Sequence, residues 1–214
     1  MIRVLPTLGV LAVAAGTSTA QIVGDFDFSN LSAEFQSTSP NGGVMEIVAD
    51  GDSSGSVTSL FGGTDYAVFA EGFAVTFGPA NFSATLDITL DTPTTATATG
   101  SFTVTDINGN TLSGQISGEW LLFGSAAFFT ADLSGVSYSN PGGTFDGGAD
   151  ALVAPGGTFI GALQFISIDS IFTSTFFTSS FQNAVVTAQA QFIPSPGGFA
   201  LAAAGLAVAA RRRR

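Results

Sequence analysis

Phe82-Ser83-Ala84-Thr85-Leu86-Asp87-Ile88-Thr89-Leu90 is the stretch of sequence that decides the fold class. Apolar and polar side chains alternate without interruption along it. A period of two residues sends successive side chains to opposite faces of a strand. The stretch therefore predicts a β-strand with one face in an apolar core and the other in water, and long strands of this kind pair in antiparallel sheets.

The same alternation continues on both sides of a turn. Residues 101–105 alternate, Asn108-Gly109 then marks a hairpin, and the return segment 112–122 places Leu112, Ile116, Trp120 and Leu122 on one face. Further strand candidates are 127–138, 157–168 and 184–193, with shorter and less regular ones at 44–49, 57–61 and 66–77. Between them, 140–157 is rich in glycine and predicts a surface loop. We expect an all-β protein: a single antiparallel β-sandwich or barrel-like domain over residues 21–193.

The charge distribution excludes several classes of function. All five basic residues of the 214 lie at the ends of the chain, Arg3 and Arg211 to Arg214, while all 16 acidic residues lie between them. The body offers no cation to phosphates, so nucleic acid is excluded as an electrostatic partner. The chain also has no Cys and no His, which excludes disulfides and structural zinc.

Residues 1–20 have the three parts of a secretion signal. Arg3 supplies the positive start, an apolar stretch follows, and Ser18-Thr19-Ala20 places small residues before a cleavage point. Such a segment is removed on export. We therefore expect a signal helix that is cleaved between Ala20 and Gln21.

Residues 194–214 form a second segment with its own organisation. Pro194-Ser195-Pro196 and two glycines precede an apolar run, Phe199 to Ala210, and the chain ends in four arginines, Arg211, Arg212, Arg213 and Arg214. As a helix the run is roughly 18 Å long at 1.5 Å per residue, against a hydrocarbon core of about 30 Å. Such a short transmembrane helix suits transient inner-membrane anchoring, with the arginines cytoplasmic and the body outside. Retention as a plain anchor is the alternative.

This three-part tail resembles the PEP-CTERM sorting signal, which exosortases of Gram-negative bacteria recognise. The family motif is Pro-Glu-Pro, and here Ser195 stands in place of the glutamate. The resemblance covers only the tail. It implies an exosortase-like processing enzyme as a partner, and transfer of the body to the cell surface or an extracellular polysaccharide matrix.

Two motifs in the body have oxygen-rich patterns. Asp50-x-Asp52-x-Ser54-Gly55 resembles the first half of a calcium loop, so Asp50 and Asp52 are candidate calcium ligands, although Phe61 stands where such a loop ends in Glu. A solvated turn is the alternative. The same stretch matches G-x-S-x-G, but the body has no His or Lys to activate a serine. Asp106-x-Asn108-x-Asn110 also alternates oxygens, and its hairpin turn accounts for it.

Enzyme activity has little support in the sequence. Glycoside hydrolysis needs only paired carboxylates, and Glu119 lies beside Trp120, a candidate platform for a sugar ring. Trp120 falls on the apolar face of its segment, however, where core packing accounts for it. We expect a non-enzymatic, exported structural protein with no cofactor. The alternative is a carbohydrate- or calcium-binding surface module.

The uncompensated acidity leads to a first prediction. With 16 carboxylates and no cation in the body, mutual repulsion should be relieved by ions. The melting temperature of the body should therefore rise with added Ca²⁺. If Mg²⁺ or matched ionic strength gives the same rise, screening alone is responsible, and no response to any ion would mean that repulsion does not limit stability.

Overall fold

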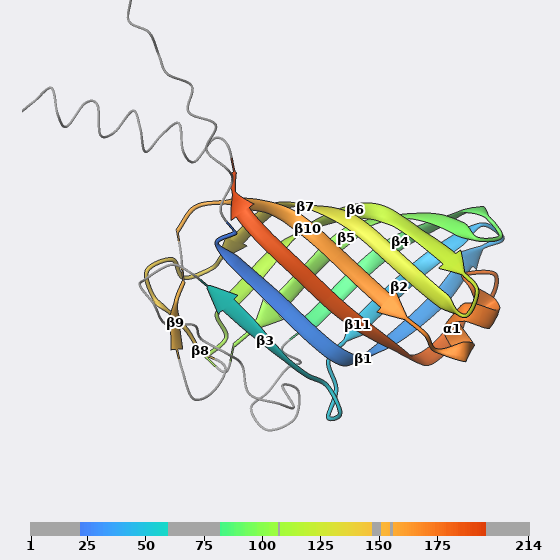
Figure 1. Ribbon diagram of the computed structural model, residues 1–214, viewed down its shortest axis with the longest axis horizontal. Helices are drawn as coiled ribbons and strands as arrows, with labels where there is room; N and C mark the ends of the chain where they lie inside the picture. The colour runs from blue at the N-terminus through green and yellow to red at the C-terminus, as the bar shows by residue number, and fades with distance from the viewer. Residues whose placement is uncertain (1–21, 60–81, 107, 147–150, 155, 196–214) are drawn as a thin grey trace, which may run out of the picture.

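The computed structural model describes residues 22–59, 82–106, 108–146, 151–154 and 156–195. Nearly all of this part of the chain is β-structure (Figure 1), as the alternating sequence predicts. The signal segment, most of the C-terminal tail and the candidate strand 66–77 lie outside the described residues. The expected flanking helices are therefore not described.

The structure resolves the choice between sandwich and barrel in favour of a closed antiparallel barrel. Eight strands follow one another around it in the order β1, β2, β4, β5, β6, β7, β10 and β11, and β11 pairs with β1 to close the ring. Their bounds are β1 Gly24–Ser39, β2 Gly42–Val48, β4 Phe82–Thr92, β5 Thr95–Thr105, β6 Thr111–Phe123, β7 Ala126–Tyr138, β10 Phe159–Ser167 and β11 Phe181–Pro194.

Four described elements lie outside this ring. Strand β3 (Ser54–Ser59) pairs with the first half of β1, beside the place where β2 has ended. A small hairpin, β8 (Thr144–Asp146) and β9 (Ala151–Val153), lies within the glycine-rich segment predicted as a loop. The helix α1 (Ser170–Thr175) precedes β11. Sequence periodicity predicted neither the hairpin nor the helix, because both are shorter than the window over which a period can be recognised.

The seam between β1 and β11 brings the two ends of the barrel chain together. Gly24 lies opposite Phe192, the Val23 N–H donates to the Phe192 carbonyl at 2.8 Å, and the Ser195 N–H donates to the Thr158 carbonyl at 3.1 Å. The described chain therefore enters and leaves at the same end of the barrel, and α1 lies at the other end (Figure 1). Because the ring closes within 24–194, each of its eight strands has a neighbouring strand on both sides.

The wall is apolar toward the axis and polar toward the outside. On β4, Leu86 and Ile88 are buried, whereas their neighbours Thr85 and Asp87 are exposed. The faces predicted for the hairpin and for 184–193 are confirmed: Ile116 and Trp120 are buried, and so is every second residue from Ala184 to Phe192.

Aromatic rings fill the axis. Toward the end with the termini, Phe26 contacts four other rings at centroid distances of 5.1–5.8 Å: Phe28, Phe82, Phe102 and Phe192. Phe82 contacts Phe165, which stacks on Trp120 and so joins this group to the rings of the other half. Each such pair contributes about 0.5–1.5 kcal/mol beyond its buried area.

The helix α1 closes one end of the barrel with phenylalanines. Asp169 caps its start by accepting from the Ile171 N–H at 2.7 Å, and Phe176, with a φ of 30°, caps its end. Phe172 and Phe177 meet Trp120 edge-on at 4.9 and 5.7 Å. This short helix therefore completes the core and does not form a separate layer.

Glycines make room for the rings. A Cβ at Gly55 would lie 2.5 Å from the Phe28 ring, and one at Gly114 would lie 2.8 Å from the Phe102 ring. Neither distance is tolerable for real atoms, so these strand positions must lack a side chain. The chain has 21 Phe and 27 Gly, and some of these glycines are needed so that the phenylalanine rings can pack.

Substitutions on the inner and the outer face of the barrel wall should have different effects on stability. Leu86→Ala and Ile116→Ala should each lower the free energy of unfolding by about 2–5 kcal/mol, because each leaves a cavity in a packed interior. Their outward neighbours, Thr85→Ala and Gln115→Ala, should cost about 0.5 kcal/mol or less. Urea titration of residues 21–195, followed by circular dichroism, measures all four. Equal losses on the two faces would mean that the division into faces is wrong.

Candidate functional site

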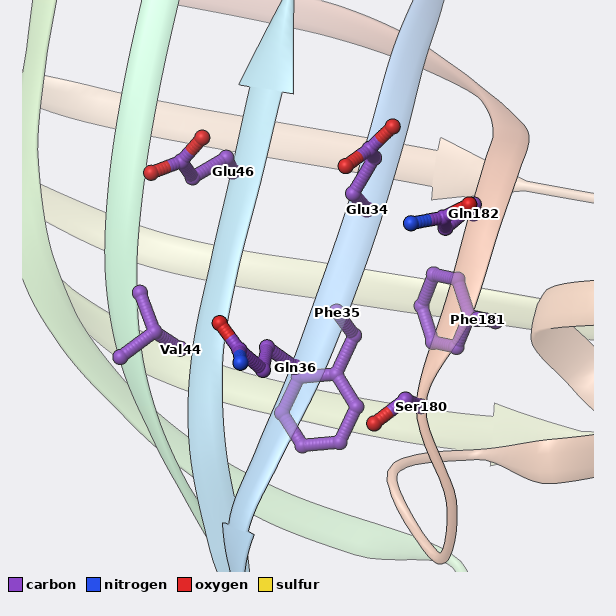
Figure 2. A pocket seen from close by; sticks show the side chains of 8 residues that line it. All are labelled: Glu34, Phe35, Gln36, Val44, Glu46, Ser180, Phe181 and Gln182. Atoms are coloured by element: carbon purple, nitrogen blue, oxygen red, sulfur yellow. The ribbon is translucent and has the colours of Figure 1, made fainter.

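An open groove of about 620 Å³ lies on the outer wall where β1, β2 and β11 run side by side (Figure 2). Glu34 and Glu46 lie directly opposite each other on β1 and β2, and both are exposed. Gln36 and Gln182 add amide groups beside them. The remaining lining residues are Phe35, Val44, Ser180 and Phe181. This groove is the candidate site because it gathers carboxylates and amides on one surface.

A break in the strand register forms the groove. Ala33 pairs with Ala184 and Phe35 with Phe181, so β11 holds one residue more than β1 over this interval. Asn183 absorbs the extra residue with a φ of 58°. A bulge of this kind bends a strand and redirects its side chains, and the groove lies beside it.

Chemically, the groove suits hydrogen bonding better than acid–base catalysis. Like charges directly opposite on paired strands repel each other, so Glu34 and Glu46 favour a ligand with hydroxyl groups or a cation between them. Both carboxylates are exposed on the outer wall, in an open groove that does not separate them from bulk water. No local sequence pattern indicates this pair, since the two residues meet only through the β1–β2 register.

The candidate calcium ligands Asp50 and Asp52 lie on the turn between β2 and β3. Asp50 Oδ1 accepts from the Asp52 N–H at 2.9 Å and from the Ser53 hydroxyl at 3.3 Å. The Ser53 hydroxyl in turn donates to the Asn30 carbonyl at 2.8 Å. In the described part of the chain, no group of three Asp, Glu, His or Cys gathers as a metal cage would require. The local bonds are those of a side-chain-stabilised turn, and calcium binding here stays a prediction.

The second oxygen-rich motif is a hairpin turn, as predicted. Asp106 is 3% exposed, and its Oδ1 accepts from the Asn108 and Asn110 N–H groups at 2.9 and 2.7 Å. Gly109 takes a φ of 82°, which glycine adopts without strain. The carboxylate satisfies the backbone of the β5–β6 turn.

Glu119 and Trp120 point to opposite sides of β6. Glu119 is exposed on the outer wall, while Trp120 is fully buried and stacks on Phe129 at 5.0 Å. The tryptophan is therefore not available as a sugar platform, and its predicted role in the core is confirmed. Among the described residues, its Nε1 has no hydrogen-bond partner, because aromatic rings surround it.

A half-buried acid lies at the end of the barrel that holds the termini. Burial raises the pKa of Asp25, and the nearby Asp27 carboxylate raises it further. Asp25 Oδ1 is buried and has no hydrogen-bond partner within the described part of the chain. Burial likewise raises the pKa of the Tyr138 hydroxyl, and the negative charge of Asp25 adds to the effect. These groups lie together in the fold although 25 and 138 are distant in sequence.

Of the sorting-signal residues, the structure describes the first two. Pro194 ends β11, and Ser195 follows it with a backbone bond to Thr158. Pro196 and Arg211 to Arg214 lie outside the described residues, as do Ala20 and Gln21 at the expected cleavage point. Within the described ranges, no helix has both the length and the apolar character needed to span a bilayer.

Comparison with known proteins gives no relative: no protein-family model, curated protein or solved structure matches this chain.

The half-buried Asp25 gives a pH-dependent prediction. Because its pKa is raised in the folded state, the protonated acid favours folding, and that contribution is lost as pH rises through the folded pKa. Asp25→Asn should therefore be more stable than the parent at pH 7. The difference should shrink as pH falls toward the ordinary aspartate range, about 4.

Thermal unfolding of both proteins between pH 3.5 and 7 measures this difference. Asp87→Asn is the matched control, since it removes one carboxylate from an exposed position of β4. An equal gain in the two variants would attribute the effect to net charge and not to the burial of Asp25.

Proposed function

We propose that this chain is an exported cell-surface or extracellular-matrix protein with a structural, non-enzymatic role, sorted by an exosortase-like system. The observation that carries the proposal is the pairing of a signal-like start with the Pro194-Ser195-Pro196, apolar and Arg211–Arg214 tail. A secretion signal by itself indicates export alone, and an apolar tail by itself suits a plain membrane anchor. Together, around an acidic body without cysteine, they favour export followed by sorting.

The position of the barrel ends supports this proposal. Gly24 and Phe192 are partners on the β1–β11 seam, so both termini of the barrel emerge at one end. A tail held in a membrane would leave the barrel intact and carry it by that end, with α1 facing away (Figure 1). Removing the tail after Ser195 would leave every strand pair in place.

The filled interior supports a structural role. Eight-stranded barrels that hold a ligand keep it inside the barrel. Here the axis holds Phe26, Phe102, Phe165 and Trp120, all at most 2% exposed. Recognition would therefore use the outer wall or the loops.

A carbohydrate- or calcium-binding surface module is the second candidate, and the groove of Figure 2 favours it. Carboxylate oxygens suit Ca²⁺, and Gln36 and Gln182 can pair with sugar hydroxyls. Calorimetric titration with Ca²⁺ and with extracted matrix polysaccharide tests this alternative. Saturable binding that Glu46→Gln abolishes would favour it over the structural role.

Processing provides the test of the main proposal. The mature protein should begin at Gln21 and lack Arg211 to Arg214, because both ends have the organisation of removable signals. Intact mass spectrometry of protein extracted from the cell surface measures this. A mass that retains the four arginines would contradict sorting by cleavage and indicate a plain membrane anchor.

A further inference from the structure

The outer wall changes character abruptly toward the α1 end of the barrel. One row of outward residues, read across β6, β7, β10 and β11, is Glu119, Thr130, Gln164 and Gln189. The next outward row toward α1 is Leu121, Phe128, Ile166 and Thr187, each beside the next in the strand register. Within two residues along β6, β7 and β10, a polar wall becomes an apolar one, while β11 still has a threonine at this level.

A further set of apolar residues extends this surface to the rim. Phe123 ends β6 and is 75% exposed, and Ile168, which follows β10, is 80% exposed. Val185 on β11 is 46% exposed, and its N–H donates to Asp169, the neighbour of Ile168. Leu121, Phe123, Phe128, Ile166, Ile168 and Val185 together form what we call the rim patch.

The rim patch is about as large as the largest apolar patch found on ordinary monomeric proteins. From the exposed fractions of 46–80% for four of its members, and roughly 150–250 Å² for a large side chain, its exposed apolar area is on the order of 500 Å². The largest patch on an ordinary monomer is roughly 300–600 Å² and often functional. A standard protein interface covers roughly 800 Å² per partner, so the rim patch would form the apolar centre of such an interface and the polar residues around it would supply the rest.

The rim patch carries no charge in a body that otherwise holds 16 acids and no cation. Its nearest neighbour in sequence with a carboxylate is Asp169, whose two oxygens accept from the Ile171 and Val185 N–H groups at 2.7 and 3.2 Å. A partner can therefore cover the patch without stripping water from an unpaired charge. A complementary partner would therefore present an uncharged apolar surface to the rim patch and not a cationic one.

We propose that the rim patch is a self-association surface, on which a second copy of this chain docks its own rim patch about a two-fold axis. Such a contact closes after two copies and gives a dimer. The patch lies at the α1 end of the barrel, opposite the end where β1 begins and β11 ends, so neither terminus of the described chain covers it (Figure 1). The proposal is independent of the sorting tail.

The affinity between two copies of this chain should depend on salt in a distinctive way. Two bodies that each carry 16 acids and no base repel each other at low ionic strength, and added salt screens that repulsion while leaving apolar contact intact. The dimer should therefore become tighter as salt rises. A partner held by attraction to the acids would bind more weakly instead.

Sedimentation equilibrium of residues 21–195, which carry the complete barrel and lack the apolar tail, tests the proposal at 20 mM and 500 mM NaCl. We expect dimer formation that is favoured by the higher salt. Ile168→Asp should raise the dimer dissociation constant about tenfold or more, because it places a charge in the apolar contact. Phe123→Ser should weaken the dimer in the same direction. Circular dichroism checks that each variant is folded.

The matched control is Thr89→Asp, which adds the same charge at an exposed position of β4, on another part of the barrel wall. It should leave the dissociation constant within about twofold, as distant surface changes do. A protein that stays monomeric at both salt concentrations would overturn the proposal. So would a dimer that salt weakens, or one that Thr89→Asp weakens as much as Ile168→Asp does.

Discussion

A closed barrel of eight strands has an interior of nearly fixed width, and filling that interior is the constraint on which the rest of this structure depends. The chain fills it with aromatic rings, which bury a large area per residue. Rings of this size fit only where the neighbouring strand has a residue without a side chain, as at Gly55 and Gly114. With no cysteine and no cation in the body, this packing takes the place of the disulfides and ion pairs that stabilise many other domains.

The two-residue alternation predicted the strands in which it is unbroken. It did not predict β1, in which a bulge inserts an extra residue and moves the apolar side chains from even to odd positions. The strand β4 alternates throughout and was predicted correctly. In β1, Phe26 and Phe28 face inward, and then Leu31 and Ala33 do, because Asn30 with a φ of 56° takes up an extra residue. Such a shift destroys the two-residue period in the sequence although the strand continues. Closure into a barrel depends on the β1–β11 pairing between the two ends of the body, which no local pattern reports.

The residues considered for a functional site could be placed from the sequence only where the alternation within a single strand was sufficient. The inward face of β6 was sufficient to assign Trp120 to the core. The groove requires Glu34 and Glu46 to meet across β1 and β2, and a bulge at Asn183 to open the wall beside them. The rim patch similarly depends on the registers of four strands. Since the interior is occupied, the groove and the rim patch are the surfaces through which a matrix or cell-surface role would act.

Aromatic packing fills the barrel axis and excludes water, and the single tryptophan reports on this central claim directly. Trp120 is fully buried among Phe129, Phe165 and Phe172, and its indole N–H finds no hydrogen-bond partner in the residues that the structure describes. Fluorescence of residues 21–195 with acrylamide as quencher is the most direct measurement. We expect blue-shifted emission that acrylamide barely quenches until the protein unfolds. Red-shifted, readily quenched emission from the folded protein would show that water reaches the axis, and it would contradict a filled aromatic interior.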